Sequence, residues 1–281
     1  MRAACVAISH LSASLERAAD RGLVRRPVIV GDRKTVVDCS GEAVAAGVAP
    51  GMPLREALAR CPDAAFVQAR LDHYERVFER GTGALERVSP FVEPHPLEGW
   101  YVDVRGLEGH YRDDLALAGA LVEAVRSATG LLASAGLAEG KAISRIAAIT
   151  SAPGDVCVVT PGREAAFLAP LDVALLPVSS RTVERLRAFG VRAVGDLTRF
   201  GLSPLQAQFG REGRRLWELA QGVDGEPVVG RLPREALRAE HQFDAPVVSA
   251  DALVAAGQQL LRRLLRHLGH RAARVLRLAL L

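Results

Sequence analysis

The fold class is decided by the stretch 131–150, which reads LLASAGLAEGKAISRIAAIT. Its first part, 131–136, is a short apolar run that predicts a buried strand. Its second part, 141–150, carries apolar residues at helical spacing and predicts a helix. A strand followed directly by a helix is the repeating unit of proteins that mix both element types, so the stretch indicates an α/β or α+β fold.

The sequence on the N-terminal side of this stretch continues the same pattern. Strands are predicted at 3–8, 27–31, 35–39, 91–94 and 99–104, and helices at 12–21, 40–46, 53–60, 71–88 and 113–129.

The pattern changes after Pro161. Residues 163–217 are broken into short helices by proline and glycine, which predicts a small helical domain. The segment 226–240 is rich in proline and charge and is typical of a linker. Beyond it we expect a strand-like 240–243, a long basic helix at 249–268 and an apolar strand at 275–281. Because the chain ends inside that strand, we expect a truncated last domain.

Composition narrows the classes of protein. The 281 residues suggest two or more domains, and 49% hydrophobic with 24% charged residues is typical of a globular protein. There is no secretion signal and no apolar run of the roughly 20 residues that a membrane span needs, so a cytoplasmic, nucleoid-associated protein without a membrane partner is expected. The four cysteines form no CxxC pair, which argues against a zinc ribbon.

The net charge is +4, and arginines gather near the C-terminus, which favours a polyanionic partner.

Several short motifs follow one another along the chain: AGVAPGMP at 46–53, CP at 61–62, WYVDV at 100–104, SAGLA at 134–138 with Lys141 and Arg145, GVRAVGDL at 190–197, FG at 209–210, LW at 216–217 and QGVD at 221–224. Together, and in this order, they resemble the Y-family (translesion) DNA polymerases, in particular polymerase IV and UmuC-like relatives.

The resemblance implies a right-hand architecture with a mixed-sheet palm, small fingers, a helical thumb and a partial β-α-β little finger. The domains implied are a palm at 1–10 and 66–162, fingers at 11–65, a helix-hairpin-helix-like thumb at 163–228, a linker at 229–239, and the first half of a little finger at 240–281.

The same resemblance indicates where the catalytic carboxylates of the family would lie. Polymerases of this kind use two magnesium ions held by clustered acids. The first metal-binding position falls on Ala7, and the acidic pair of the second motif falls on Glu98 and Gly99. One acid of three is present, so we expect that the magnesium sites are lost and that there is no cofactor.

The positions implied to bind the incoming nucleotide have also changed. The triphosphate-binding tyrosine and arginine fall on Gly41 and Val44, and the aromatic residue that excludes a ribose hydroxyl falls on Ser12. Of the nucleotide-binding positions, only the one at Arg145 still carries a basic residue, as it does in the family. The positions for the metal, for the triphosphate and for excluding the ribose hydroxyl are thus all altered, so we expect a protein that is not an enzyme. If it is active, we expect a DNA-directed DNA polymerase.

The residues expected to contact DNA lie in the thumb and near the C-terminus. In the thumb hairpin, Ser179, Ser180 and Arg181 stand where the family has a glycine-rich turn, and a plain helix N-cap at Ser179 or Ser180 is an equal alternative. Near the C-terminus the candidates are Arg262, Arg266, Arg271 and Arg274.

The favoured function is a catalytically inactive DNA-associated adaptor in translesion synthesis, induced mutagenesis and DNA repair, similar to ImuB-type subunits. Its implied partners are DNA, an error-prone replicative-type polymerase, the sliding clamp and an accessory mutagenesis protein. A second reading is a divergent active polymerase that uses Glu98, Asp103, Asp38 or Glu42 as relocated ligands. A third is a protein-interaction scaffold without DNA binding.

Overall fold

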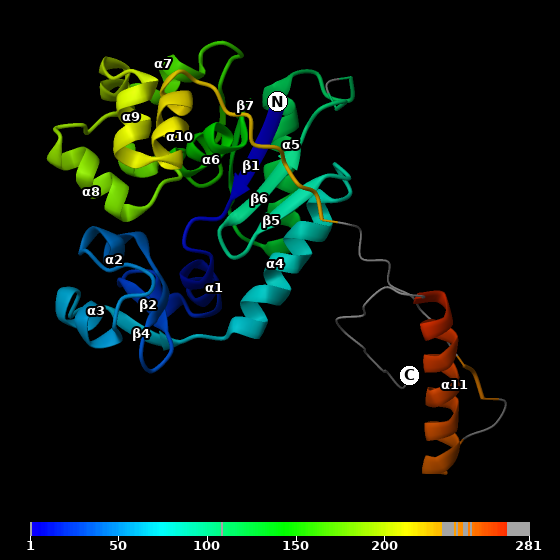
Figure 1. The fold of residues 1–281 in the computed structure, drawn as a ribbon. Helices are drawn as coiled ribbons and strands as arrows, with labels where there is room; N and C mark the ends of the chain where they lie inside the picture. The colour runs from blue at the N-terminus through cyan, green and yellow to red at the C-terminus, as the bar shows by residue number, and fades with distance from the viewer. Residues whose placement is uncertain are drawn as a thin grey trace. The chain divides into compact units, whose positions relative to one another are not determined.

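The computed structural model describes residues 2–107, 109–231, 239, 241–243, 247 and 249–268. The chain divides into a compact unit up to Arg231 and a second unit from Leu232 onward. The first unit contains the predicted palm, fingers and thumb, whose exact boundaries stay a prediction. Figure 1 shows the order of the elements along the chain.

A five-stranded sheet forms the centre of the first unit. Its strands are β1 (Arg2–Ala7), β5 (Val92–His95), β6 (Gly99–Asp103), β7 (Ser134–Glu139) and β8 (Val156–Val158), in the spatial order β5-β6-β1-β7-β8. β1 pairs antiparallel with β6 and β7, whereas β7 and β8 are parallel. The predicted mixed sheet, and with it the fold class, is confirmed.

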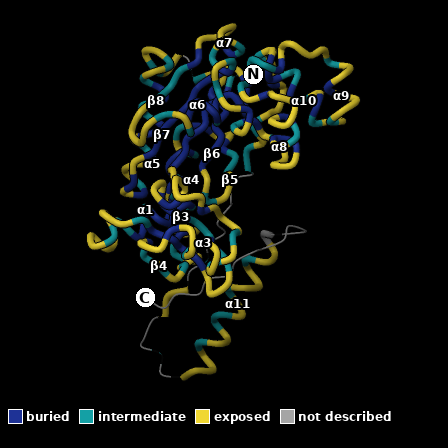
Figure 2. Tube along the Cα trace, turned by 90° about the vertical axis from the view of Figure 1, so that its left-hand side faces the viewer, coloured by how far each residue is buried: buried dark blue, intermediate teal, exposed yellow. Residues whose placement is uncertain are grey.

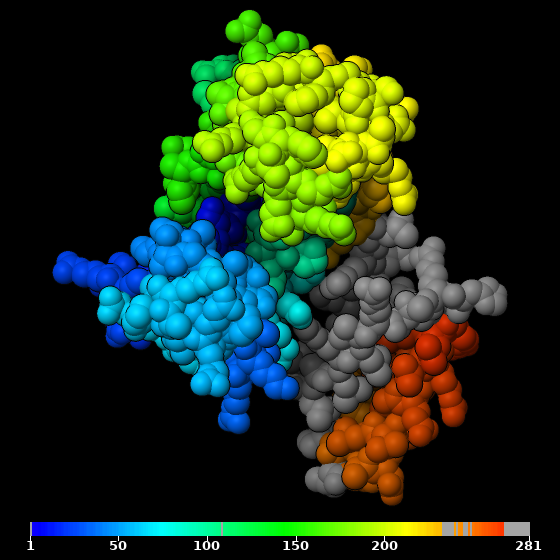
Figure 3. Space-filling view, turned by 60° about the vertical axis from the view of Figure 1, so that its left-hand side comes forward, coloured from blue at the N-terminus to red at the C-terminus, as the bar shows by residue number. Residues whose placement is uncertain are grey.

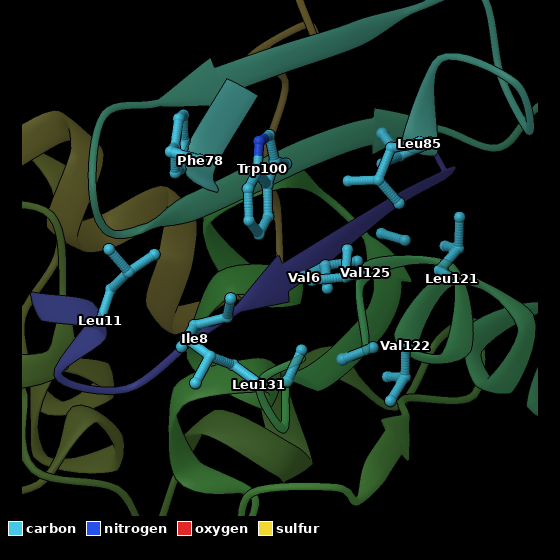
Figure 4. Packing of buried hydrophobic residues seen from close by; sticks show 14 of the residues in the cluster. Val6, Ile8, Leu11, Phe78, Leu85, Trp100, Leu121, Val122, Val125 and Leu131 are labelled. Carbon is cyan, nitrogen blue, oxygen red and sulfur yellow. The ribbon is translucent and has the colours of Figure 1, made fainter. Parts of the chain in front are cut away.

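One face of this sheet is covered by the helices α4 (Leu71–Leu85) and α5 (Asp114–Thr129). The largest side chain there is Trp100, which is fully buried. Its ring stacks on Phe78 with centroids 4.5 Å apart, and its indole N–H donates to the Thr82 hydroxyl at 2.8 Å. Figure 4 shows this layer of side chains. Apolar residues at every second position of β1 and at helical spacing in α4 and α5 therefore meet in one core.

The other face of the sheet is covered by α6 (Lys141–Thr150). The helix lies unusually close to β7, because a Cβ atom at Gly136 would stand 2.1 Å from the Ser144 carbonyl oxygen. On its far side, Ile143 and Ile146 join the core of the thumb. One helix thus belongs to two hydrophobic cores.

The predicted fingers form a small α/β layer of their own. It contains α1 (Leu11–Ala19), β2 (Val28–Gly31), β3 (Val36–Cys39), α2 (Gly41–Ala45), α3 (Leu54–Arg60) and β4 (Ala65–Gln68), and its three strands lie in the order β3-β2-β4. A short 3-10 turn at Arg21–Leu23 follows α1.

The thumb is built from short helices. These are α7 (Glu164–Leu168), α8 (Ser180–Ala188), α9 (Leu202–Phe209) and α10 (Arg211–Ala220), with 3-10 turns at Val173–Leu175 and Val194–Arg199. Figure 3 shows the surface hollowed between the thumb, coloured yellow-green, and the fingers, coloured light blue.

The second unit contains α11 (Ala250–Leu268), the predicted long basic helix. Figure 2 shows it mostly exposed, in contrast to the buried strands of the sheet. The predicted strand at 240–243 is wrong for residues 241–243, which form no regular element. The predicted strand at 275–281 lies outside the described residues. Among the described helices, none is long and apolar enough to cross a membrane.

Candidate functional site

Ala7, Glu98 and Gly99, the positions that the resemblance aligns with the catalytic acids of the family, come together at one end of the sheet. We call them the palm tip. The register pairs Ala7 at the end of β1 directly with Gly99 at the start of β6. Glu98 is the last residue of the turn that joins β5 to β6, in which Leu97 has a φ of 62°. The three positions are therefore neighbours in the fold, and their correspondence to the catalytic positions of the family stays a prediction.

The surroundings of Ala7 are apolar. Its side chain clusters with Cys5, Tyr101 and Ala148, and it is 4% exposed. Burial raises the pKa of the Cys5 thiol to about 12. At Gly99 a Cβ atom would stand 2.4 Å from the Val6 carbonyl oxygen, so the backbone has no room for a side chain at that position.

Glu98 is the one carboxylate of the palm tip, and two nitrogen-bearing side chains lie against it. Its Oε2 atom lies 3.1 Å from Nη2 of Arg145 and 3.2 Å from Nδ1 of His95. Arg145 projects from α6, so the ion pair joins that helix to the β5–β6 turn. A single carboxylate already paired with a guanidinium does not fit a centre of two magnesium ions.

The four carboxylates of the relocated-ligand reading do not converge. Glu98 is paired as described above, and Asp103 lies at the far end of β6, opposite Ala3, about 13 Å along the strand. Side-chain hydrogen bonds from Arg105 lower the pKa of Asp103. Across the described ranges, no group of three or more His, Cys, Asp or Glu side chains is placed to hold a metal ion.

The other two carboxylates are used inside the fingers. Asp38 accepts the backbone N–H groups of Ser12 at 2.8 Å and Ala13 at 3.3 Å, and so caps α1 from β3. Glu42 pairs with Arg17 at 2.9 Å, and that hydrogen bond lowers the pKa of Glu42 to about 2. Neither carboxylate is directed to the palm tip.

The predicted nucleotide positions have different environments. Ser12 is 1% exposed, Gly41 opens α2 next to the ring of His10, and Val44 on the same helix is 46% exposed. Arg145 is held by Glu98. Their assignment as altered nucleotide positions stays a prediction.

The thumb hairpin is capped from within the protein. Ser179 is the N-cap of α8, and its hydroxyl accepts the N–H of Thr182 at 3.3 Å. Its own N–H and hydroxyl donate to Glu212 of α10 at 2.9 and 3.1 Å, and the Thr182 hydroxyl also donates to Glu212. The hydrogen bond from Thr182 is the largest cause that lowers the pKa of Glu212. The donors of Ser179 that were predicted to contact phosphate are therefore already bound by a carboxylate of the same chain.

The remaining predicted DNA contacts divide into two groups. Ser180 and Arg181 are exposed on α8, and Arg262 and Arg266 are exposed on α11. Arg271 and Arg274 lie outside the described residues. Contact with DNA at each of these positions stays a prediction.

A buried charged network near the palm tip was not predicted from the sequence. Nζ of Lys141 lies 2.6 Å from Glu93, 3.0 Å from Glu226 and 4.7 Å from the centre of the Tyr101 ring. Burial of Lys141 opposes its charge, but the hydrogen bonds to both glutamates outweigh it and raise its pKa. Asp224 accepts the N–H of Ala142 at 2.5 Å and pairs with Arg215 at 2.7 Å.

The network continues along residues 224–231. Arg231 pairs with Glu79 of α4 at 2.8 Å and with Glu86, the residue that follows this helix, at 2.5 Å. Its backbone N–H donates to the Val92 carbonyl at the edge of β5. Residues 224–231, predicted in part as a linker, are therefore fixed on the sheet by charged anchors.

Comparisons with known proteins agree with this architecture. The profile of the impB/mucB/samB family matches residues 7–149. The chain is 36% identical to DNA polymerase IV of Methanoculleus marisnigri over 87% of this chain and 69% of that protein. It is 34% identical to DNA polymerase IV of Dehalococcoides mccartyi over 79% of this chain and 58% of that protein.

Solved structures show the same fold. The crystal structure of DinB from Sulfolobus solfataricus matches with a TM-score of 0.72 at 25% identity, over 81% of this chain and 69% of that chain. The insertion ternary complex of Dbh DNA polymerase matches with a TM-score of 0.68 at 25% identity, over the same shares of the two chains.

These comparisons contradict one expectation from the sequence. We expected a protein that is not an enzyme, but the relatives are named DNA polymerase IV and the structural neighbours are Y-family polymerases, which points to an enzyme. The expectation rested on residue types at a few positions, whereas the similarity extends over most of the chain. Polymerases of this family normally use Mg²⁺, so the expected loss of the metal stays a prediction.

Proposed function

Since the chain belongs to the impB/mucB/samB family of Y-family polymerases, we propose that it works on primer–template DNA in translesion synthesis and DNA repair. The observation that carries this proposal is the shared architecture of sheet, fingers and thumb, with a TM-score of 0.72 over 81% of the chain. The structural neighbours include complexes titled ternary and binary complexes of a DNA polymerase. The exposed arginines of the thumb and of α11 are suited to phosphate contacts.

The experiment is a DNA-binding titration of the whole chain. A fluorescently labelled primer–template is titrated at several salt concentrations, and its anisotropy is recorded. We expect the logarithm of the binding constant to fall linearly with the logarithm of the salt concentration, because binding to phosphates releases counterions. Flat titration curves on both primed and single-stranded DNA would instead support the scaffold without DNA binding.

We also propose that the protein acts as an adaptor that links DNA to other replication proteins. It is supported by the resemblance to ImuB-type subunits, and the partners proposed are an error-prone replicative-type polymerase, the sliding clamp and an accessory mutagenesis protein. The chain spans 58 to 69% of the length of the two curated relatives described above, so the partners of a whole protein are part of this proposal. Size-exclusion chromatography with each purified partner tests it: co-elution supports the adaptor role, and separate elution with every partner contradicts it.

We further propose that the palm tip does not hold Mg²⁺. Its single carboxylate, Glu98, is paired with Arg145, and Gly99 has no room for a side chain. Titration of Mn²⁺ followed by electron paramagnetic resonance tests this proposal. A bound Mn²⁺ signal that disappears in Glu98→Gln contradicts it. This proposal is limited to metal binding at Ala7, Glu98 and Gly99, and it does not bear on whether the chain is an enzyme.

A further inference from the structure

The outer face of α8 carries a stripe of two arginines and one phenylalanine. Arg181, Arg185 and Phe189 follow one another at intervals of four residues, from the first turn of α8 to the residue after its last turn, and so lie along one side of it. Phe189 is 57% exposed, so most of its ring is accessible from outside. The only acid of α8, Glu184, lies beside this stripe and not on it.

A second aromatic residue supports the stripe from α9. The ring of Phe209 meets Phe189 edge to face, with centroids 6.4 Å apart and an interplanar angle of 84°. The guanidinium of Arg185 lies over the Phe209 ring at 4.8 Å and donates to the Gln208 carbonyl at 3.2 Å. Arg185, Phe189 and Phe209 thus form a fixed, partly exposed surface, which we call the thumb platform.

Three arginines on α8 and α10 carry unpaired positive charge. Arg181 on α8 and Arg211 and Arg214 on α10 are exposed, and their side chains make no ion pair or hydrogen bond with any residue in the described ranges. The hydrogen bonds that Ser179 and Thr182 donate to Glu212 bring the first turn of α10 against the first turn of α8, so Arg211 and Arg181 flank the same junction. Glu212 itself is occupied by these donors and does not neutralise the arginines.

We propose that the thumb platform binds single-stranded DNA, with an unpaired base stacked on Phe189 and the flanking arginines on its phosphates. An exposed ring beside a fixed guanidinium accepts the face of a base, and the face of a base is free only when the base is unpaired. Arg181, one turn before Arg185, and Arg211, two residues after Phe209, give the complementary charge for the DNA backbone. The proposal rests on the proposed function, since it names the form of DNA that one surface of the thumb recognises.

The test compares single-stranded and duplex DNA on the whole chain. Fluorescein-labelled oligothymidylate and a blunt duplex of the same length are titrated with the unmodified protein and with Phe189→Ala. We expect the variant to bind oligothymidylate about tenfold more weakly, as is typical for the loss of one stacked base. Binding of the duplex is expected to change less than about twofold, because no base face is open to the ring.

Two further variants control the experiment. Arg187→Ala lies on the same helix but pairs with Asp172 at 3.1 Å, so it is expected to leave both affinities unchanged. Phe189→Leu keeps an apolar side chain but removes the aromatic face, so it is expected to bind oligothymidylate as weakly as Phe189→Ala. Circular dichroism melting curves verify that each variant is folded.

The outcomes separate this inference from the proposed function. An unmodified protein that binds neither DNA contradicts the proposed function. An unmodified protein that binds both, with Phe189→Ala affected equally on duplex and single strand or on neither, overturns the thumb platform. Full rescue by Phe189→Leu, or displacement of oligothymidylate by polyglutamate at equal charge, also overturns it, because stacking on a base is then not the source of affinity.

Discussion

The cations of the sheet side and three arginines of the thumb differ in whether their charge is paired. On the sheet side, Lys141, Arg145 and Arg231 are each paired with carboxylates of the same chain. On the outer face of the thumb, Arg181, Arg211 and Arg214 have exposed side chains without a partner among the described residues. The difference teaches that charge on the sheet side holds the fold together, whereas the charge of these three thumb arginines is available to a polyanion from outside.

The largest expected effect belongs to the sheet side. Trp100→Ala removes a fully buried ring together with its stacking on Phe78, and should cost roughly 3–5 kcal/mol of unfolding free energy. Urea denaturation followed by circular dichroism measures it. Trp100→Phe keeps most of the ring and loses the hydrogen bond to Thr82, so it should cost less. Equal losses for both variants would contradict this account of the core.

A buried charge pair gives the next largest effect. The side chain of Asp224 is fully buried, accepts the N–H of Ala142 and pairs with Arg215. Asp224→Asn keeps the shape but removes the charge, and should cost roughly 1–3 kcal/mol of stability. DNA affinity of the folded variant should not change. A loss of DNA affinity without a loss of stability would reverse the roles that we give to the two sides.

Substitution of the thumb arginines is expected to change DNA binding and to leave stability unchanged. The double variant Arg181→Ala, Arg211→Ala should lower the salt dependence of single-strand binding by roughly 0.7 in slope for each phosphate that the protein no longer binds. Its unfolding free energy should stay within about 0.5 kcal/mol of the unmodified value, since both side chains are exposed. Anisotropy titrations at several salt concentrations give the slope. A slope equal to that of the unmodified chain would show that these thumb arginines do not bind the DNA backbone.

The smallest expected effect is the pH dependence of the cap on α8. The folded-state pKa of Glu212 lies below its usual 4.5, so its contribution to stability is present above pH 4.5 and is lost as the pH falls through the folded value. Melting temperatures of the unmodified chain and of Glu212→Gln, measured between pH 7 and pH 3, should therefore approach each other at the acid end. Parallel curves over the whole range would show that Glu212 does not cap α8 through its charge.

Much of the fold follows from the sequence, because long periodic segments determine it. The helices at 71–85, 114–129 and 141–150 were predicted within a few residues of their observed ends. The strands β4 and β8 were missed, because each is short, lies at a sheet edge, and is only partly buried. A strand of that kind carries little alternation in its own sequence and depends on its neighbour for its conformation.

The contacts around the candidate site could not be predicted from the sequence. The motifs named Ala7, Glu98 and Gly99, and the register shows that Ala7 and Gly99 are paired, but the role of these positions stays a prediction. The capping carboxylates Asp38 and Glu212 were not foreseen as caps, because each reaches a helix far away in the sequence. The stacking of Arg185 on Phe209 depends on how α8 and α9 pack, and no local pattern in the sequence specifies it.

The position of α6 between two cores has a consequence for how the molecule responds to heat. Ala148 packs on the sheet near Ala7, while Ile143 and Ile146, less than two turns away, complete the interior of the thumb. A thumb that separated from the sheet would expose both isoleucines and half of the helix, so partial opening between the two is costly. Residues 2–231 should therefore melt in a single cooperative transition, and a calorimetric scan should show one peak for this unit rather than two.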